Sequence, residues 1–145
     1  SCMWTLHQLP DFDVLRAALG QIASIQRGSG AAVWISDFQR MRDPSAAGDM
    51  LACVDPDSPE VFRQDAVASE AAAFTFAELS TELSAAGLEG MRSGHSTPLP
   101  YLQAYWMFGA SGKPDVPKIM RRNELHGQVR REAALFRWGF TAKPF

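Results

Sequence analysis

Basic side chains that could contact phosphates are concentrated in one stretch near the C-terminal end of the chain, residues 118–132. This stretch, KIMRRNELHGQVRRE, holds five of the candidate contacts: Lys118, Arg121, Arg122, Arg130 and Arg131. Clustered lysine and arginine are the electrostatic mark of a surface that binds nucleic acid. A solvated helix whose arginine stems cover apolar surface would have the same sequence pattern.

The cluster belongs to a charge asymmetry along the whole chain. Residues 1–90 carry five basic and thirteen acidic side chains, a net charge of −8, and residues 91–145 carry nine and three, a net charge of +6. Such a split indicates binding of nucleic acid or of an oppositely charged protein, or two portions that neutralise each other within the fold. We expect a single domain over residues 1–145, with an acidic α/β portion over residues 1–90 and a basic, mainly helical portion over residues 91–145.

Residues suited to catalysis or metal binding are sparse. The three histidines, His7, His95 and His126, are far apart, and the chain lacks the HExxH and paired-cysteine spacings of zinc sites. It also lacks a glycine-rich phosphate loop followed by lysine. We therefore expect no metal, no cofactor and no assigned catalytic residue. A small enzyme would have to gather Asp37, His95 and His126 in one pocket.

The apolar pattern predicts an α+β domain with about four helices and a small sheet or hairpin. Helices are expected at residues 11–26, 59–74, 75–87, 97–108 and from 115 onward, and strands at 31–36 and 50–56. Residues 98–108 also have the aromatic content of a buried strand. In the helix at 75–87, Thr75 and Glu78 have capping-box spacing and Gly87 suits a left-handed end. The expected core includes Trp34, Leu79, Leu83, Trp106 and Phe136.

The location of the protein is inferred from its cysteines and apolar runs. Cys2 and Cys53 are too few for a disulfide framework, so we expect free thiols. The longest apolar runs are too short to cross a bilayer, and the first ten residues lack the order of a secretory signal. These features predict a cytoplasmic protein with no membrane partner.

Residues 75–102, TFAELSTELSAAGLEGMRSGHSTPLPYL, resemble the helix-turn-helix segment of serine recombinases and related mobile-element proteins. The resemblance rests on the order of a capped helix, a basic glycine-bearing loop and a Ser/Thr-started second helix. It implies that the second helix reads or clamps DNA, with Gln103 as a base-reading residue. The positions that match the family pattern are Arg92, Gly94, Ser96 and Thr97, and Arg92 is the candidate DNA contact among them. The aromatic run at residues 105–108 departs from the family pattern, and the recombinase catalytic portion has no counterpart upstream.

The sequence thus predicts a non-catalytic DNA-binding regulator or accessory protein, of a mobile element if the resemblance holds. For single-stranded nucleic acid, Tyr101, Tyr105 and Trp106 could supply base stacking. The alternative is a protein-interaction module, such as an immunity or adaptor protein, whose acidic surface between Asp37 and Glu70 meets a basic partner. A small enzyme is the third hypothesis, and a homodimer is compatible with each of them.

If Arg121, Arg122, Arg130 and Arg131 each neutralise a phosphate, binding to duplex DNA should weaken with salt. The expected log-log slope is about −0.9 per phosphate, or roughly −3.6 for four contacts. Changing Arg130 and Arg131 together to Ala should reduce its magnitude by about 1.8. Titration of labelled duplex at several salt concentrations measures the slope, and a slope that the double substitution leaves unchanged would contradict the assignment.

Overall fold

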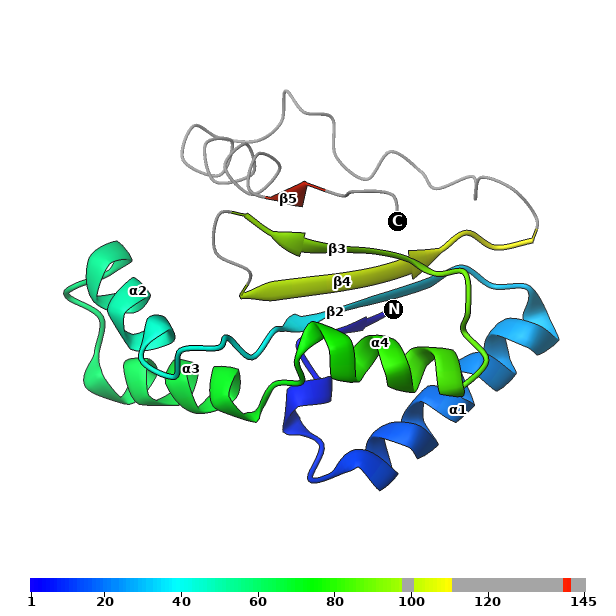
Figure 1. Ribbon diagram of the computed structural model, residues 1–145, viewed down its shortest axis with the longest axis horizontal. Helices are drawn as coiled ribbons and strands as arrows, with labels where there is room; N and C mark the ends of the chain where they lie inside the picture. Colours follow the sequence, from blue (N-terminus) through cyan, green and yellow to red (C-terminus); the bar gives the residue numbers. More distant parts are fainter. Residues whose placement is uncertain (98–100, 111–139, 142–145) are drawn as a thin grey trace.

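The computed structural model describes residues 1–97, 101–110 and 140–141, and its elements are shown in Figure 1. In chain order they are β1 (Cys2–Met3), the short 3-10 helix η1 (Leu6–Gln8), α1 (Phe12–Ser29), β2 (Val33–Phe38), α2 (Ala46–Val54), α3 (Glu60–Ala72), α4 (Phe76–Ala85), β3 (Arg92–Ser96), β4 (Leu102–Met107) and β5 (Phe140–Thr141). The expected α+β class, with about four helices and a small sheet, is confirmed.

The strands form one mixed sheet in the order β1-β2-β4-β3-β5. The short edge strand β1 runs parallel to β2, and the other neighbouring pairs are antiparallel. In the centre of the sheet, Trp34 lies opposite Trp106 and Ile35 lies opposite Tyr105. The central strand β4 is therefore paired along both edges, by β2 and by β3.

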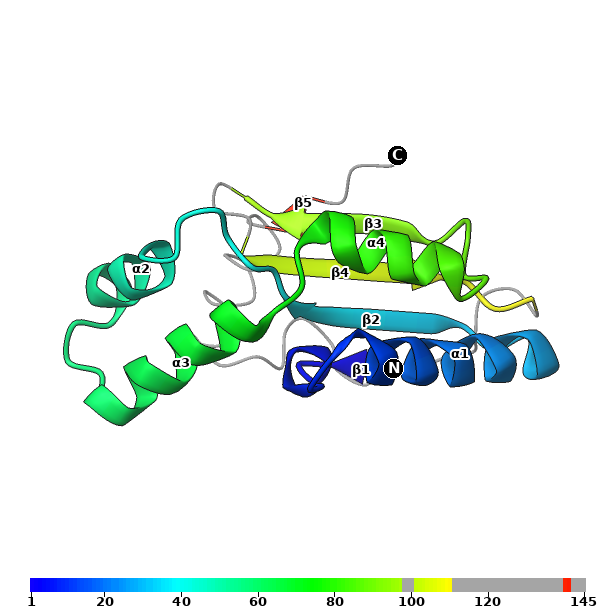
Figure 2. The ribbon, with the colours of Figure 1, turned by 60° about the horizontal axis from the view of Figure 1, so that its bottom comes forward.

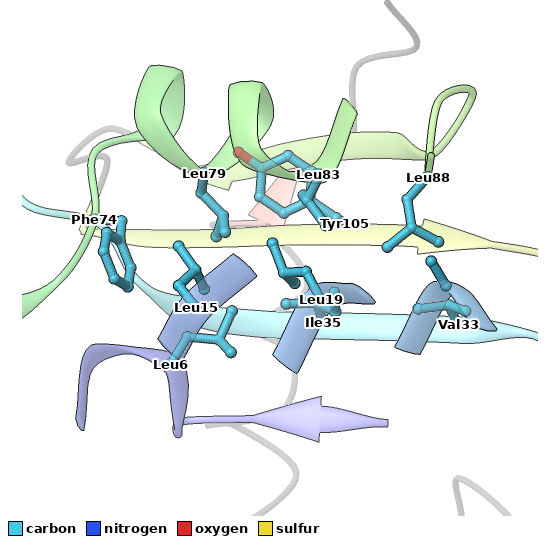
Figure 3. Close-up of a cluster of buried hydrophobic side chains, with 11 residues drawn as sticks. Leu6, Leu15, Leu19, Val33, Ile35, Phe74, Leu79, Leu83, Leu88 and Tyr105 are labelled. Carbon is cyan, nitrogen blue, oxygen red and sulfur yellow. The ribbon is translucent and has the colours of Figure 1, made fainter. Parts of the chain in front are cut away.

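Two helices, α1 and α4, cover one face of the sheet, whereas α2 and α3 extend from one end of it (Figure 2). Between the sheet and the covering helices lies the core drawn in Figure 3, which includes Leu15 and Leu19 of α1, Leu79 and Leu83 of α4, and Ile35 and Tyr105 of the strands. Helices α1 and α4 are also joined by a bidentate ion pair, because Arg16 donates to both carboxylate oxygens of Glu82 at 2.8 and 2.9 Å. The hydrogen bond from Arg16 holds the pKa of Glu82 below its ordinary value.

The sequence explains why α1 forms and where it ends. The Asp11 side chain accepts a hydrogen bond from the Val14 amide, which satisfies a backbone donor at the start of the helix. Leu15, Leu19 and Ala23 follow at intervals of four residues, so they share the buried face. The helix ends at Gly30, whose φ of 65° is readily adopted only by glycine.

Helix α4 has the predicted capping box. The Thr75 side chain accepts a hydrogen bond from the Glu78 amide, and the Glu78 carboxylate accepts one from the Thr75 amide. Gly87 follows the helix with a φ of 81°, as its position predicted. The burial of Leu79 and Leu83 is confirmed as well.

Two expectations about residues 50–59 are wrong. Residues 50–54 belong to α2 instead of a strand, because a short apolar run does not by itself distinguish helix from strand. Ser58 followed by Pro59 also has the residue order of a capped helix start. The Ser58 side chain nevertheless does not cap α3: Pro59 is the N-cap residue, and the buried Ser58 hydroxyl has no hydrogen-bond partner within the described residues.

The helix expected over residues 97–108 is also wrong, because residues 102–107 form β4. Aromatic side chains favour strands when they can pack against neighbouring strands, and pairing with β2 and β3 supplies that environment. The described part of residues 91–110 is accordingly made of strands and connections, not mainly of helix. The helix expected from residue 115 onward, with Phe136, lies outside the described residues.

Among the helices within the described residues, none has the length and apolar character needed to cross a bilayer.

Removing the Thr75 hydroxyl tests the start of α4. Thr75→Ala should lower the free energy of unfolding by about 1 kcal/mol, because the Glu78 amide loses its acceptor. Thr81→Ala is the matched control, since Thr81 is exposed in the middle of α4 and its hydroxyl donates to the Ala77 carbonyl instead of capping the helix. Urea denaturation measures both variants, and equal midpoints for the two would contradict the capping role.

Candidate functional site

The structure places only two of the predicted DNA contacts. Arg92 lies on β3 and Gln103 on β4. The candidate catalytic residue His126 lies outside the described residues. So do the other five predicted DNA contacts, which are Lys118, Arg121, Arg122, Arg130 and Arg131.

Gln103 cannot serve as a base-reading residue, because its side chain is inside the fold. It is 0% exposed, and its amide nitrogen donates to the carbonyl oxygens of Phe38 at 2.9 Å and Phe74 at 2.8 Å. Its amide oxygen accepts from the Tyr105 hydroxyl at 3.2 Å. The alternation of side chains along β4 sends Gln103 to the face that the helices cover, which a helix over 97–108 would not have done.

The residues of the predicted helix-turn-helix do not form that motif. Residues 92–96 form β3 where a loop was expected, and residues 102–107 form β4 where a second helix was expected. The two strands pair with each other, with Arg92 opposite Trp106. Arg92 is nevertheless exposed and remains available for a ligand.

Arg92 belongs to a cluster of large side chains that we call the aromatic corner: Trp34, Arg92, Trp106 and Phe108. The rings of Trp34 and Trp106 stack across β2 and β4, with centroids 5.6 Å apart and an angle of 29° between their planes. The Arg92 guanidinium carbon lies 5.6 Å from the centroid of the Phe108 ring. Trp34 is 42% exposed and Phe108 is 65% exposed, so the expectation that Trp34 belongs to the core is wrong.

Strand alternation explains how the aromatic corner forms. Val33 and Ile35 point into the core, so Trp34 between them points to the opposite face of the sheet. Farther along that face Ser36 and Ala104 are buried, and Phe38 beyond them is only partly exposed.

A close backbone approach holds this end of the sheet together. The Ala110 amide donates to the Gly30 carbonyl at 2.9 Å, so the chain after β4 is bonded to the chain before β2. A Cβ atom on Gly109 would lie 2.7 Å from the Gly30 carbonyl oxygen, a distance that real Cβ atoms essentially never show. Because residue 109 is glycine, the segment after β4 can approach the segment before β2 closely enough to form this hydrogen bond.

Carboxylates are absent from the face of the described strands that carries the aromatic corner. The residues of β2, β3 and β4 that alternate onto this face are Trp34, Ser36, Phe38, Arg92, Gly94, Ser96, Leu102, Ala104 and Trp106. The only carboxylate in these three strands, Asp37, is on the helix-covered face opposite Gln103. Among the described residues of these three strands, the one charged side chain on this face is therefore that of Arg92.

The candidate catalytic residues do not meet. Asp37 is buried, and its carboxylate binds His7 twice, at 2.6 Å from the ring nitrogen Nδ1 and at 3.1 Å from the backbone amide. His95 lies on the other side of Gln103, so it is two strand spacings, about 9–10 Å, from Asp37. Within the described residues no three His, Cys, Asp or Glu side chains are grouped so that they could hold a metal ion.

The acidic surface lies on α2 and α3, which we call the acidic helix pair. The two residues expected to bound this surface, Asp37 and Glu70, are not part of it. Asp37 and Glu70 are both buried, and the Glu70 carboxylate accepts a hydrogen bond from the Met41 amide. The exposed carboxylates in and beside the two helices are those of Asp49, Asp55, Asp57, Glu60 and Asp65. Two large apolar side chains lie among them, Val61 at 74% exposure and Phe62 at 55%.

Comparison of this chain with models of protein families, with curated proteins and with solved structures found no match in any of the three. A functional assignment therefore depends on the contacts, exposure and charge of the chain's own residues.

Gln103→Met tests whether Gln103 is structural. The substitution preserves side-chain volume but removes the hydrogen bonds from Gln103 to the carbonyls of Phe38 and Phe74, the second of which keeps the Arg40 amide as a donor. We expect a loss of about 2 kcal/mol of stability, because two buried hydrogen bonds disappear. The exposed residue Gln8 supplies the control Gln8→Met, which should change stability little. Thermal and urea denaturation measure both; an unchanged midpoint for Gln103→Met, with altered preference among DNA sequences, would restore the base-reading role.

Proposed function

We propose that this protein is a non-catalytic nucleic-acid-binding protein that takes single-stranded DNA on the aromatic corner. The observation that carries the proposal is the exposed Trp34 ring, which stacks on the half-buried Trp106 at the end of the sheet, with Arg92 opposite Trp106 on the next strand. Bases of a single strand stack on such aromatic faces, and each stacked base contributes about 1–3 kcal/mol. Arg92 would contact the phosphate that follows a stacked base.

A single strand fits the contacts better than a duplex does. Duplex recognition needs side chains that reach base edges in a groove, and the residue expected to do so, Gln103, is buried and fully bonded. In a duplex the base faces are covered by their neighbours, whereas in a single strand they are free to stack on indole rings. The proposal therefore keeps DNA as the ligand and changes the form in which it binds.

The basic stretch at residues 118–132 has a place in this proposal as the source of further phosphate contacts. Its candidates remain Lys118, Arg121, Arg122, Arg130 and Arg131. On single-stranded DNA each contact adds about −0.7 to the salt slope instead of −0.9. The role we propose is that of a regulator or accessory protein, and the free thiols of Cys2 and Cys53 favour the cytoplasm as its location.

The acidic helix pair supports a second candidate function, a protein-interaction module. Val61 and Phe62 are more exposed than Trp34 and lie among carboxylates, with Arg63 as the one basic residue of the two helices. A partner with a basic surface and an apolar pocket would match both features. Because α2 and α3 extend from the sheet at the end opposite the aromatic corner, one protein could use both surfaces (Figure 1).

Trp34→Ala tests the leading candidate, with Trp4→Ala as the matched control. The two tryptophans have similar exposure, 42% and 39%, but Trp4 packs on Phe38 away from the corner. Trp34→Ala should weaken binding of a labelled oligothymidylate about tenfold or more, because one stacked base is lost. Trp4→Ala should leave the dissociation constant within about twofold when circular dichroism shows both variants folded.

Arg92→Gln in the same titration should reduce the magnitude of the salt slope by about 0.7, since one phosphate contact disappears. Absence of salt-sensitive binding to single-stranded DNA by well-folded wild-type protein at low salt would reject the proposal. That result would leave the protein-interaction module as the leading function. Equal weakening by Trp34→Ala and Trp4→Ala would also reject the aromatic corner as the site.

A further inference from the structure

A cavity of about 630 Å³ lies at the other end of β2 from the aromatic corner. Its walls include Gln39, Arg40, Met41 and Arg42 after β2, Phe76 at the start of α4, and His95 on β3. Its volume falls within the range of about 300–1,000 Å³ that is usual for small-molecule sites. Of the described residues that line it, Ala46 is the first residue of α2, and none belongs to the aromatic corner.

Three charged side chains line the cavity, Arg40, Arg42 and Asp43, and they differ in what holds them. Two of the five basic residues in the first ninety positions, Arg40 and Arg42, line it. Arg40 is already neutralised: it donates to both carboxylate oxygens of Glu78 at 2.7 and 2.8 Å and to the Ala73 carbonyl at 3.0 Å. Arg42 is exposed and makes no ion pair or hydrogen bond with the described residues, so its guanidinium is available to a ligand.

The carboxylate that also lines the cavity, Asp43, is held by its own loop. One of its oxygens accepts from both the amide and the hydroxyl of Ser45, at 2.9 and 3.0 Å. These bonds keep the pKa of Asp43 below its ordinary value. Asp43 therefore stays ionised and bonded to Ser45, while Arg42 keeps its donors free.

Two further polar groups in the cavity wall, the Gln39 amide oxygen and the His95 ring, could form hydrogen bonds with a ligand. The Gln39 amide oxygen is buried and has no hydrogen-bond donor among the described residues, a state that costs stability unless a ligand or water donates to it. The His95 ring lies edge-on against Phe76, with centroids 5.9 Å apart, and its nitrogens have no partner in the described part of the chain. Phe76 and Met41 supply apolar wall beside these polar groups.

We propose that this cavity binds a small anion, a carboxylate or phosphate monoester, that carries an apolar body and a hydroxyl or amino donor. Arg42 binds the anionic group, with His95 as a second donor beside it. The apolar body packs on Phe76 and Met41, and the ligand's donor satisfies the Gln39 amide oxygen. The site is independent of nucleic-acid binding, so either proposal can fail without the other.

Isothermal titration with four probes tests the site: 4-hydroxybenzoate, 4-hydroxyphenyl phosphate, inorganic phosphate and the neutral 4-hydroxybenzyl alcohol. At least one of the two aromatic anions should bind at least tenfold more tightly than the alcohol and than inorganic phosphate, because charge and apolar body act together. The two aromatic anions separate the carboxylate from the phosphate form of the ligand. Equal affinity for the alcohol, equal affinity for inorganic phosphate, or no binding of either aromatic anion would overturn the proposal.

Arg42→Gln should weaken the tighter anion about tenfold or more, because a charge-assisted contact is lost. Arg27→Gln is the matched control, since Arg27 is also exposed and unpaired within the described residues but lies at the end of α1. It should leave the affinity within about twofold. Amide shifts of wild-type protein in NMR titration give an independent readout: changes at Met41, Phe76 and His95 support the site, and changes confined to other residues refute it.

Discussion

The register between β2 and β4 determines the rest of the structure. Placing Ile35 opposite Tyr105 sends both side chains into the core, and the same register places Trp34 opposite Trp106 on the other face. Because side chains alternate along a strand, a slip of one residue would bury the tryptophans and expose the core. The accessible aromatic corner and the packed interior are two consequences of one pairing.

Polar groups in the core connect that register to the helices. Gln103 bonds the carbonyls of Phe38, at the end of β2, and of Phe74, just before α4. The Tyr105 hydroxyl bonds the Ser80 side chain of α4, and burial raises the pKa of Tyr105. This network places the start of α4 beside the chain that follows β2. The anion cavity at that point and the aromatic corner at the opposite end are therefore held by the same sheet.

Local signals in the sequence predicted α1, α3 and α4, but they missed α2 and the strands after residue 90. The capping box of Thr75 and the four-residue spacing of Leu15 and Leu19 depend on neighbours within one or two turns, so they can be read from the sequence. The strand at residues 102–107 exists because it pairs with residues 33–38, more than sixty positions earlier, and no local pattern specifies that partner. Once this segment was taken for a helix, the orientation of Gln103 could not be predicted.

The most direct test of the aromatic corner is photocrosslinking of a bromodeoxyuridine-substituted single strand, followed by mass spectrometry of the linked peptides. Stacked bases crosslink to the aromatic residues they touch, so the links should fall on Trp34, Trp106 or Phe108. The same links should disappear when an excess of unlabelled oligothymidylate is added. Specific links confined to other parts of the chain, with none in residues 33–38 or 102–108, would contradict the proposal that the corner holds the bases.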